Sequence, residues 1–265
     1  MQYNIKLIKT FLICIILSFL LIHTWSNIAL ANKNYCPTVV IDAGHGGKDP
    51  GTVGQFSYEK DVTLAYAKLL KKVLERKKRY KVILTRIDDK YLTLQARIKK
   101  AQKLHSDIFI SLHADAHDDY SMRGISVYTL SEKASDKEAA RLASIENNVD
   151  YNFKNFRTEH HEVKETLFAL LSRNTGNASA EFAHILVKML GQKIQLLNNT
   201  HRFAGFKVLK GLSMPAVLIE LGYLSNDEEE LLLHTKNYQM IIVTTIEQAL
   251  DMYFAKYFNH TNINK

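Results

Sequence analysis

Cysteine and proline are scarce in this chain of 265 residues, and their scarcity excludes whole classes of protein. There are only two cysteines, Cys14 and Cys36, and three prolines beside 11 glycines. Because Cys14 lies in a segment that we expect to be removed, the mature chain can form no internal disulfide and needs a packed core. So little proline and glycine also excludes collagen-like and low-complexity disordered chains.

Long apolar runs are missing too, apart from one near the start of the chain. Residues 11–22 are almost wholly apolar, follow Lys6 and Lys9, and precede the small residues Ala29 and Ala31. This pattern is typical of a secretory signal peptide over residues 1–31 with cleavage near Ala31. The alternative is an uncleaved membrane anchor, but a spanning helix needs about 20 apolar residues. We therefore expect an exported protein, in a periplasm rather than the medium.

Acidic residues are outnumbered, because the chain has 35 Lys and Arg against 27 Asp and Glu. Removal of residues 1–31 takes away two lysines and no acid, which leaves a net charge of +6. A basic exported protein is attracted to anionic surfaces such as a cell wall or phospholipid headgroups. Nucleic acid is the other usual partner of a basic protein, and export argues against it.

The order of the predicted elements is strand, helix, strand, helix, strand, which is typical of a parallel sheet with helices on both faces. Strands are predicted at 38–41, 81–85, 107–113, 124–130, 206–209 and 216–221, and helices at 59–77, 92–104, 135–147, 174–197 and 226–258 with a break near Thr235. The sequence therefore predicts one α/β domain over residues 32–265. Polar residues 148–172 are interpreted as an insertion that includes a helical stretch.

Two histidines follow predicted strands directly. His45 lies among glycines in GHGGKDPG, and His113 ends an apolar strand. The glycine spacing does not fit a dinucleotide or P-loop motif. Ligands of open α/β sheets bind beyond the carboxyl ends of the strands. With Glu59 at the start of a helix, these histidines would supply two His and one carboxylate, the ligands of a catalytic zinc site.

Glu220 ends the apolar strand PAVLIE. A carboxylate there is costly to bury without a partner. It suits a general base that takes a proton from a water molecule, whose pKa a zinc ion lowers to about 7, and returns it to a leaving group. A hydrogen bond to a loop is the alternative role.

The motifs together resemble one family. The chain contains, in order, IDAGHGGKDPG, YEKDVTLAYAKLL, LTR, SLHADA, ISVYTLS and PAVLIELGYLSNDEEE. This set is similar to the catalytic domain of the zinc-dependent N-acetylmuramoyl-L-alanine amidases, over most of residues 37–255. The resemblance implies zinc ligands at His45, Glu59 and His113, a catalytic Glu220, and a six-stranded, mainly parallel sheet in a three-layer domain. Ala43 and Leu221 depart from the usual pattern, and neither is a ligand.

The resemblance also suggests regulation by the insertion at 148–172, since some members carry a helix over the active site. Glu162 and Glu165 would share one helix face and could reach the metal, with an activator protein relieving this autoinhibition. A surface helix with solvated acids is the alternative. For the whole chain the alternatives are a different zinc hydrolase of the cell wall, a peptidoglycan-binding module without activity, and a nucleotide-binding protein.

Overall fold

The structure is a computed structural model that describes residues 35–149 and 165–261. The described residues from Pro37 onward form one compact unit. The predicted signal peptide at 1–31 lies outside the described residues, as does the part of the predicted insertion from 150 to 164. In the described part of the chain, no helix has both the length and the apolar character needed to cross a membrane.

Six strands form a single sheet in the order β2-β1-β3-β6-β4-β5. The strands are β1 (Thr38–Ala43), β2 (Lys81–Leu84), β3 (Ile108–Asp115), β4 (Ile125–Leu130), β5 (Leu196–Ala204) and β6 (Ala216–Tyr223). All neighbours pair in parallel except β4 and β6, which pair antiparallel. Every residue of β3 and of β6 is buried, which is what two covered faces require of central strands. The predicted fold class, a three-layer α/β domain with a mainly parallel six-stranded sheet, is confirmed.

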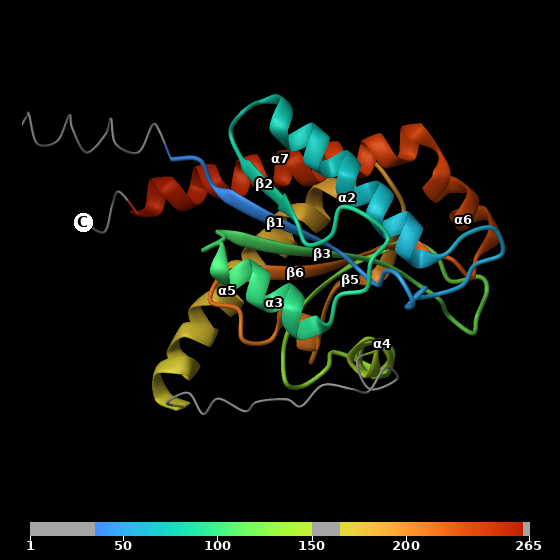
Figure 1. The fold of residues 1–265 in the computed structure, drawn as a ribbon, viewed down its shortest axis with the longest axis horizontal. Coiled ribbons are helices and arrows are strands. Elements are labelled where there is room, and N and C mark those ends of the chain that lie inside the picture. The colour runs from blue at the N-terminus through green and yellow to red at the C-terminus, as the bar shows by residue number, and fades with distance from the viewer. Residues whose placement is uncertain (1–34, 150–164, 262–265) are drawn as a thin grey trace, which may run out of the picture. The chain divides into compact units, whose positions relative to one another are not determined.

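Helices cover both faces of the sheet (Figure 1). The helices are α2 (Glu59–Arg76), α3 (Leu94–Lys103), α4 (Lys137–Asn148), α5 (Glu165–Leu190), α6 (Asp227–His234) and α7 (Lys236–Thr261), with a 3-10 turn η2 at Lys207–Leu209. On one face, α2, α5 and α7 pack on the odd-numbered residues of β1 and β6, including Ala43 and Leu221. On the other face, α3, α4 and η2 pack on Val40 and Leu218.

Local sequence sets the helix ends. Thr93, Asp136 and Asn226 each accept a hydrogen bond from a backbone N–H in the first turn of α3, α4 and α6, as N-caps do. Thr235 separates α6 from α7, at the predicted break. The capped start of α4 matters for function, because it fixes the register of a helix that reaches the site at its other end.

Two predicted elements are wrong. The helix predicted at 174–197 ends at Leu190, and its last residues belong to β5, an edge strand that the sequence analysis did not predict. The predicted helix is longer because apolar residues at helical spacing continue to Leu196 and Leu197, although Gly191 interrupts the pattern. The strand predicted at 206–209 is the 3-10 turn η2, whose Val208 and Leu209 are buried. A short apolar run fits a strand and a buried turn equally well.

Candidate metal centre

The loop after β1 places His45 close to the other site residues. His45 has a φ of 56°, in the left-handed region that is uncommon outside glycine. A Cβ atom on Gly44 would lie 2.6 Å from the ring of His113, and one on Gly51 would lie 2.5 Å from the carboxylate of Glu59. The glycines of this loop therefore leave the space in which three side chains meet.

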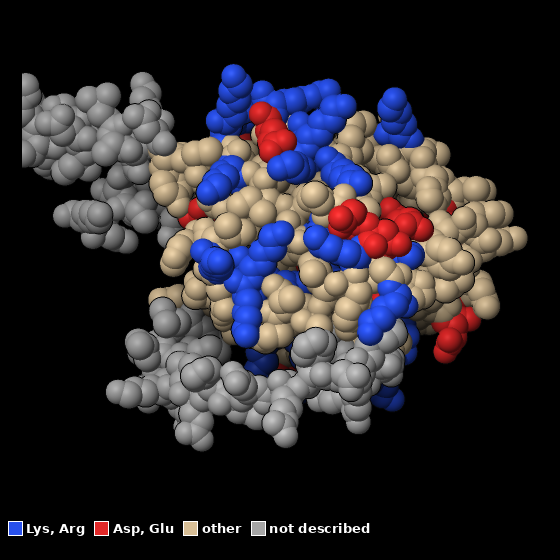
Figure 2. Space-filling view, in the orientation of Figure 1, with Lys and Arg blue, Asp and Glu red and all other residues tan. Residues whose placement is uncertain are grey.

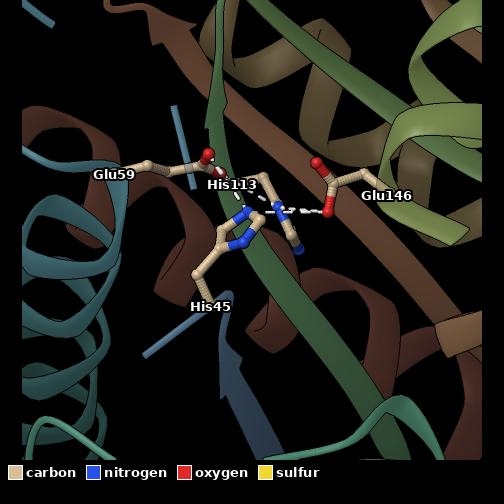
Figure 3. Close-up of side chains that lie close together, drawn as sticks. All are labelled: His45, Glu59, His113 and Glu146. Carbon is tan, nitrogen blue, oxygen red and sulfur yellow. Dashed lines mark hydrogen bonds and ion pairs between the residues drawn. The ribbon is translucent and has the colours of Figure 1, made fainter. Parts of the chain in front are cut away.

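Four buried side chains converge, and their nearest ligand atoms all lie within 4.8 Å of one another (Figure 3). His45 Nε2 lies 3.1 Å from Glu59 Oε2, and His113 Nδ1 lies 3.0 Å from Glu59 Oε1. The fourth is Glu146, whose Oε2 is 3.5 Å from His45 Nε2 and 3.3 Å from His113 Nδ1. Glu59 extends from α2 and Glu146 from α4, on opposite sides of the two imidazoles.

Further polar groups fix the direction of these ligand atoms. Asp49 Oδ2 lies 2.9 Å from His45 Nδ1, so a proton on Nδ1 leaves Nε2 as the acceptor that faces the site. The carboxylate of Glu59 accepts hydrogen bonds from the backbone N–H groups of Thr52 (2.8 Å) and Ala114 (2.9 Å). The site is thus held in one arrangement by its surroundings.

Two buried arginines hold the backbone of the His45 loop. Arg97 donates to the carbonyls of Ala43 (2.6 Å) and His45 (2.7 Å), and to the Asp42 carboxylate (2.8 Å). Arg86 donates to the carbonyls of Ala43 (3.0 Å) and Gly44 (2.8 Å). Planar guanidinium groups can bridge several acceptors at once, which a lysine ammonium cannot do in the same geometry.

Opposing forces act on the ionisation of the site. Burial by itself raises the pKa of Glu59, but His45 and His113 hold it well below its usual range. Burial lowers the pKa of His45, and the carboxylates of Glu59, Glu146 and Asp49 raise it well above its usual value. Burial also raises the pKa of Glu146. The carboxylates therefore bring negative charge together at the site. Unless a cation is bound, protonation of the histidines balances this charge.

The donor set fits a divalent metal ion. His45 Nε2 is buried and faces the carboxylate oxygens of Glu59 at 3.1 Å and Glu146 at 3.5 Å, an arrangement that a cation shared by these atoms would stabilise. Two donors bound to one tetrahedral zinc ion lie about 3.3 Å apart. The four donor separations given above lie between 3.0 and 3.5 Å, and all four ligand atoms lie within 4.8 Å of one another. Two imidazoles and carboxylate oxygens are a common zinc set, whereas calcium and magnesium prefer oxygen alone.

Glu220 lies beside this cluster on β6. It is paired in register with His113 across β3 and β6, on the same face of the sheet as Leu218. It is completely buried, and neither carboxylate oxygen has a hydrogen-bond partner in the described part of the chain. Burial, and then the negative charges of Asp115, Glu59 and Glu146, raise the pKa of Glu220 well above its usual value. A buried carboxyl group with a raised pKa is a candidate to accept and return a proton during a reaction.

The structure brings together all four residues that the sequence analysis selected and adds two that it missed. Asp49 had a signal, because a carboxylate stands four residues after His45 in a glycine-rich loop. Glu146 also had one, because it continues the buried stripe of Ala139, Leu142 and Ala143 at helical spacing. Glu162 lies outside the described residues, and Glu165 begins α5 but its side chain is not described.

Comparison with known proteins gives one consistent result. Residues 39–252 match the N-acetylmuramoyl-L-alanine amidase family. The chain is 36% identical over 219 residues to the amidase AmiC of Escherichia coli O6:H1, covering 82% of this chain and 52% of AmiC. It is 35% identical over 224 residues to AmiA of Escherichia coli K12, covering 83% of this chain and 77% of AmiA. The solved amidase AmiC2 of Nostoc punctiforme has 26% identity and a TM-score of 0.62, over 83% of this chain and 97% of that one.

Proposed function

The chain belongs to the N-acetylmuramoyl-L-alanine amidase family, and from this premise we propose that it cuts the amide bond between N-acetylmuramic acid and L-alanine in peptidoglycan. The observation that carries the proposal is the placement of a buried, unpartnered Glu220 beside a site that can hold a metal ion. The ligands would be His45, Glu59 and His113, and the ion would be zinc. The chain spans about half the length of AmiC. The proposal therefore rests on the site that this chain itself carries, and the activity of the whole relative is not assumed for it.

Glu220 would move the proton of the reaction. When bound, a zinc ion supplies a Lewis acid for the scissile carbonyl and lowers the pKa of a water molecule. Glu220 accepts a proton from the attacking water as its oxygen bonds to the lactyl carbonyl carbon. It then gives the proton to the nitrogen of L-alanine as the C–N bond breaks. Burial raises the pKa of Glu220, which makes its carboxylate a stronger base toward the attacking water.

Glu146 would regulate this site. It supplies a fourth donor, and a catalytic zinc site keeps its fourth position open for water or substrate. The observed position of α4 therefore supports an autoinhibited state in which Glu146 takes that position. This assigns autoinhibition to a residue just before the insertion predicted at 148–172. An activator protein would act by moving α4, and Glu162 and Glu165 stay candidates for a second contact.

An exported enzyme would meet its substrate outside the cytoplasm. The predicted signal peptide at 1–31 supports a periplasmic location. Cell-wall remodelling and daughter-cell separation are the processes in which cleavage of this bond would serve. No second domain is needed for the chemistry proposed.

The test is digestion of purified peptidoglycan by residues 32–265, with mass spectrometry of the products. The Glu146→Ala variant is tested beside the wild type, so that inhibition by α4 cannot hide activity. We expect free stem peptides that begin with L-alanine, lost on chelation and restored by zinc. Release of acetate would indicate a deacetylase, and cleavage within the stem peptide would indicate a peptidase. If both proteins left peptidoglycan intact, the chain would be a binding module without activity.

Glu220→Gln tests the role of the base. We expect this variant to bind zinc as the wild type does and to lose roughly 10²- to 10⁴-fold in kcat, the usual contribution of a general base. Metal content is measured together with turnover. Near-normal activity with zinc bound would show that another group carries the proton.

A further inference from the structure

A short hairpin stands next to the metal ligand Glu59. In it, Val53 and Tyr58 form an antiparallel bridge, and Gly54 N–H donates to the carbonyl of Ser57 (2.9 Å). Its base is joined to Glu59 twice: Glu59 N–H donates to the Thr52 carbonyl (2.9 Å), and Thr52 N–H donates to the Glu59 carboxylate (2.8 Å). The hairpin 52–58 therefore has a fixed position relative to the site.

Glu230 on α6 holds the tip of this hairpin. Its carboxylate accepts hydrogen bonds from the backbone N–H groups of Gln55 and Phe56 (both 2.9 Å) and from the hydroxyl of Ser57 (2.7 Å). Glu230 itself is completely buried, and its three hydrogen bonds to the hairpin are partly buried. Hydrogen bonds to a buried charged group are among the stronger ones in proteins. The carboxylate of Glu230 thus holds the hairpin in place. Glu230 belongs to the motif PAVLIELGYLSNDEEE, but it has no role in the proposed metal chemistry.

This ordered hairpin exposes apolar side chains. Val53 is 64% exposed, Phe56 58% and Tyr58 48%. Figure 1 shows the connection from β1 to α2 projecting beside α6, and at that end the surface in Figure 2 is mostly tan, without a group of charges. These side chains lie largely outside the core, so packing of the fold does not require apolar residues at these positions. Grouped exposed apolar residues mark interaction sites.

We propose that the hairpin 52–58 binds the glycan part of the substrate by stacking Phe56 and Tyr58 against a sugar ring. This inference rests on the proposed function. The scissile amide is attached to a sugar, so when it reaches the metal site a sugar ring must lie within a few ångströms of Glu59. The faces of a pyranose ring carry C–H groups and pack on aromatic rings, whereas its hydroxyls point to the ring edge.

The charges near the hairpin favour a sugar over the stem peptide. Peptide carboxylates would need a cation, and the ammonium of Lys60, 6.0 Å from the ring of Tyr58, is already bound by Asp89 (2.7 Å) and by the Gly47 carbonyl (3.0 Å). The exposed carboxylate of Asp227, which lies beside the Gln55 side chain, also disfavours peptide carboxylates, whereas the aromatic rings suit an uncharged ring. The stem peptide is then left to the opposite side of the site, near α4.

The experiment is the double substitution Phe56→Ala and Tyr58→Ala, made in the Glu146→Ala background. With polymeric peptidoglycan as substrate we expect KM to rise roughly tenfold, as for the loss of two aromatic contacts, with kcat changed less than twofold. Phe56→Tyr with Tyr58→Phe should restore KM. The matched control is Met252→Ala, which removes a side chain that is 53% exposed on α7, outside the site.

Binding and metal content separate the explanations. Sedimentation with insoluble sacculi, in the Glu220→Gln background, should show roughly tenfold weaker binding for the double variant. Unchanged KM and binding would overturn the inference and assign the hairpin to a protein partner. Loss of zinc would overturn it too, and assign the hairpin to positioning Glu59. Failure of the Glu146→Ala protein itself to cut peptidoglycan would instead contradict the proposed function.

Discussion

Glu220 combines complete burial with a carboxylate that no described donor contacts. An unsatisfied buried polar group costs about 1–3 kcal/mol, and an ionised one costs more. Native proteins tolerate such a residue where the chemistry needs it. The same reasoning applies to His45, whose left-handed φ of 56° costs of the order of 1–3 kcal/mol.

The burial of Glu220 predicts how a substitution changes stability with pH. The folded pKa of Glu220 is raised, so its contribution to stability is fully present below its usual pKa of 4.5 and is lost as pH rises through the folded value. Glutamine does not titrate. We expect Glu220→Gln to stabilise the metal-free protein more at pH 8 than at pH 5, because only the wild type has a buried carboxyl group whose ionisation the fold opposes.

Thermal unfolding of metal-free wild type and variant at both pH values measures this difference. The control is the surface substitution Glu132→Gln, which should show no such change between pH 5 and pH 8. An equal effect of Glu220→Gln at both pH values would mean that the carboxyl group ionises in the folded protein as it does in the unfolded chain.

His45, Glu59, His113 and Glu220 could be selected from the sequence because each stands near the carboxyl end of a strand or at the start of a helix. Strand ends of a parallel sheet meet at one edge, so their proximity follows from topology. Glu146 could not be placed in the same way. It lies in the last turn of a helix, and only the docking of α4 on the sheet brings it to the histidines.

At the scale of elements, α4 joins the site to the rest of the fold. Its start is anchored by Arg202, which donates to Asp136 at 3.0 Å, and its middle by Arg141, which donates to Asp115 at 3.1 Å. Near its end, Asn147 accepts from Lys207 N–H at 2.6 Å. The helix also buries Ala139, Leu142 and Ala143 against the sheet, so its displacement must expose apolar surface as well as break these polar contacts.

Removal of the carboxylate of Glu146 tests this element. We expect Glu146→Ala to raise peptidoglycan hydrolysis roughly tenfold, within the range of ordinary allosteric coupling. Ser144→Ala on the exposed side of the same helix is the matched control and should change nothing. Activity is measured by release of dye from labelled sacculi. A fall in activity would show that Glu146 assists the reaction and does not block it.

The helix α3 affects the metal through Arg97. Arg97→Lys removes the forked contacts with Asp42, Ala43 and His45, so the His45 loop is held less firmly. We expect zinc affinity to fall roughly 10- to 100-fold, as for other groups that orient ligands. Competition with a chromophoric chelator measures it, and Lys99→Ala, exposed on the same helix, is the control. Unchanged affinity would limit Arg97 to a role in folding.

Most elements could be predicted because their apolar residues repeat with a clear period. The helix α2 buries Val62, Tyr66, Leu70 and Val73 at helical spacing. The strand β5 could not, because it lies at the sheet edge and its pattern is partly inverted, with Phe203 exposed and Arg202 buried. Its Arg202 is buried only through contacts with Asp136 and Tyr128, which are distant in sequence. Such an environment comes from tertiary structure and leaves no local pattern.

At the scale of the whole molecule, the site links segments that span most of the chain. A metal ion that binds only the folded state stabilises it, by about 2.7 kcal/mol at a hundredfold excess over Kd. For a domain of this size we expect zinc to raise Tm by about 5–10 °C. Differential scanning calorimetry with zinc and with chelator measures this shift. The His113→Ala variant should lose the shift, and an equal shift in it would place the zinc elsewhere.

The order of the strands has a consequence for synthesis. The last strand in the chain, β6, lies in the middle of the sheet, between β3 and β4. A chain that is still being made therefore cannot pair its two halves, and it lacks the residue that would move the proton. Long-range pairing of this kind folds late and cooperatively. A nascent or truncated copy is thus inert by its topology, so a hydrolase of this design cannot act before its chain is complete through β6.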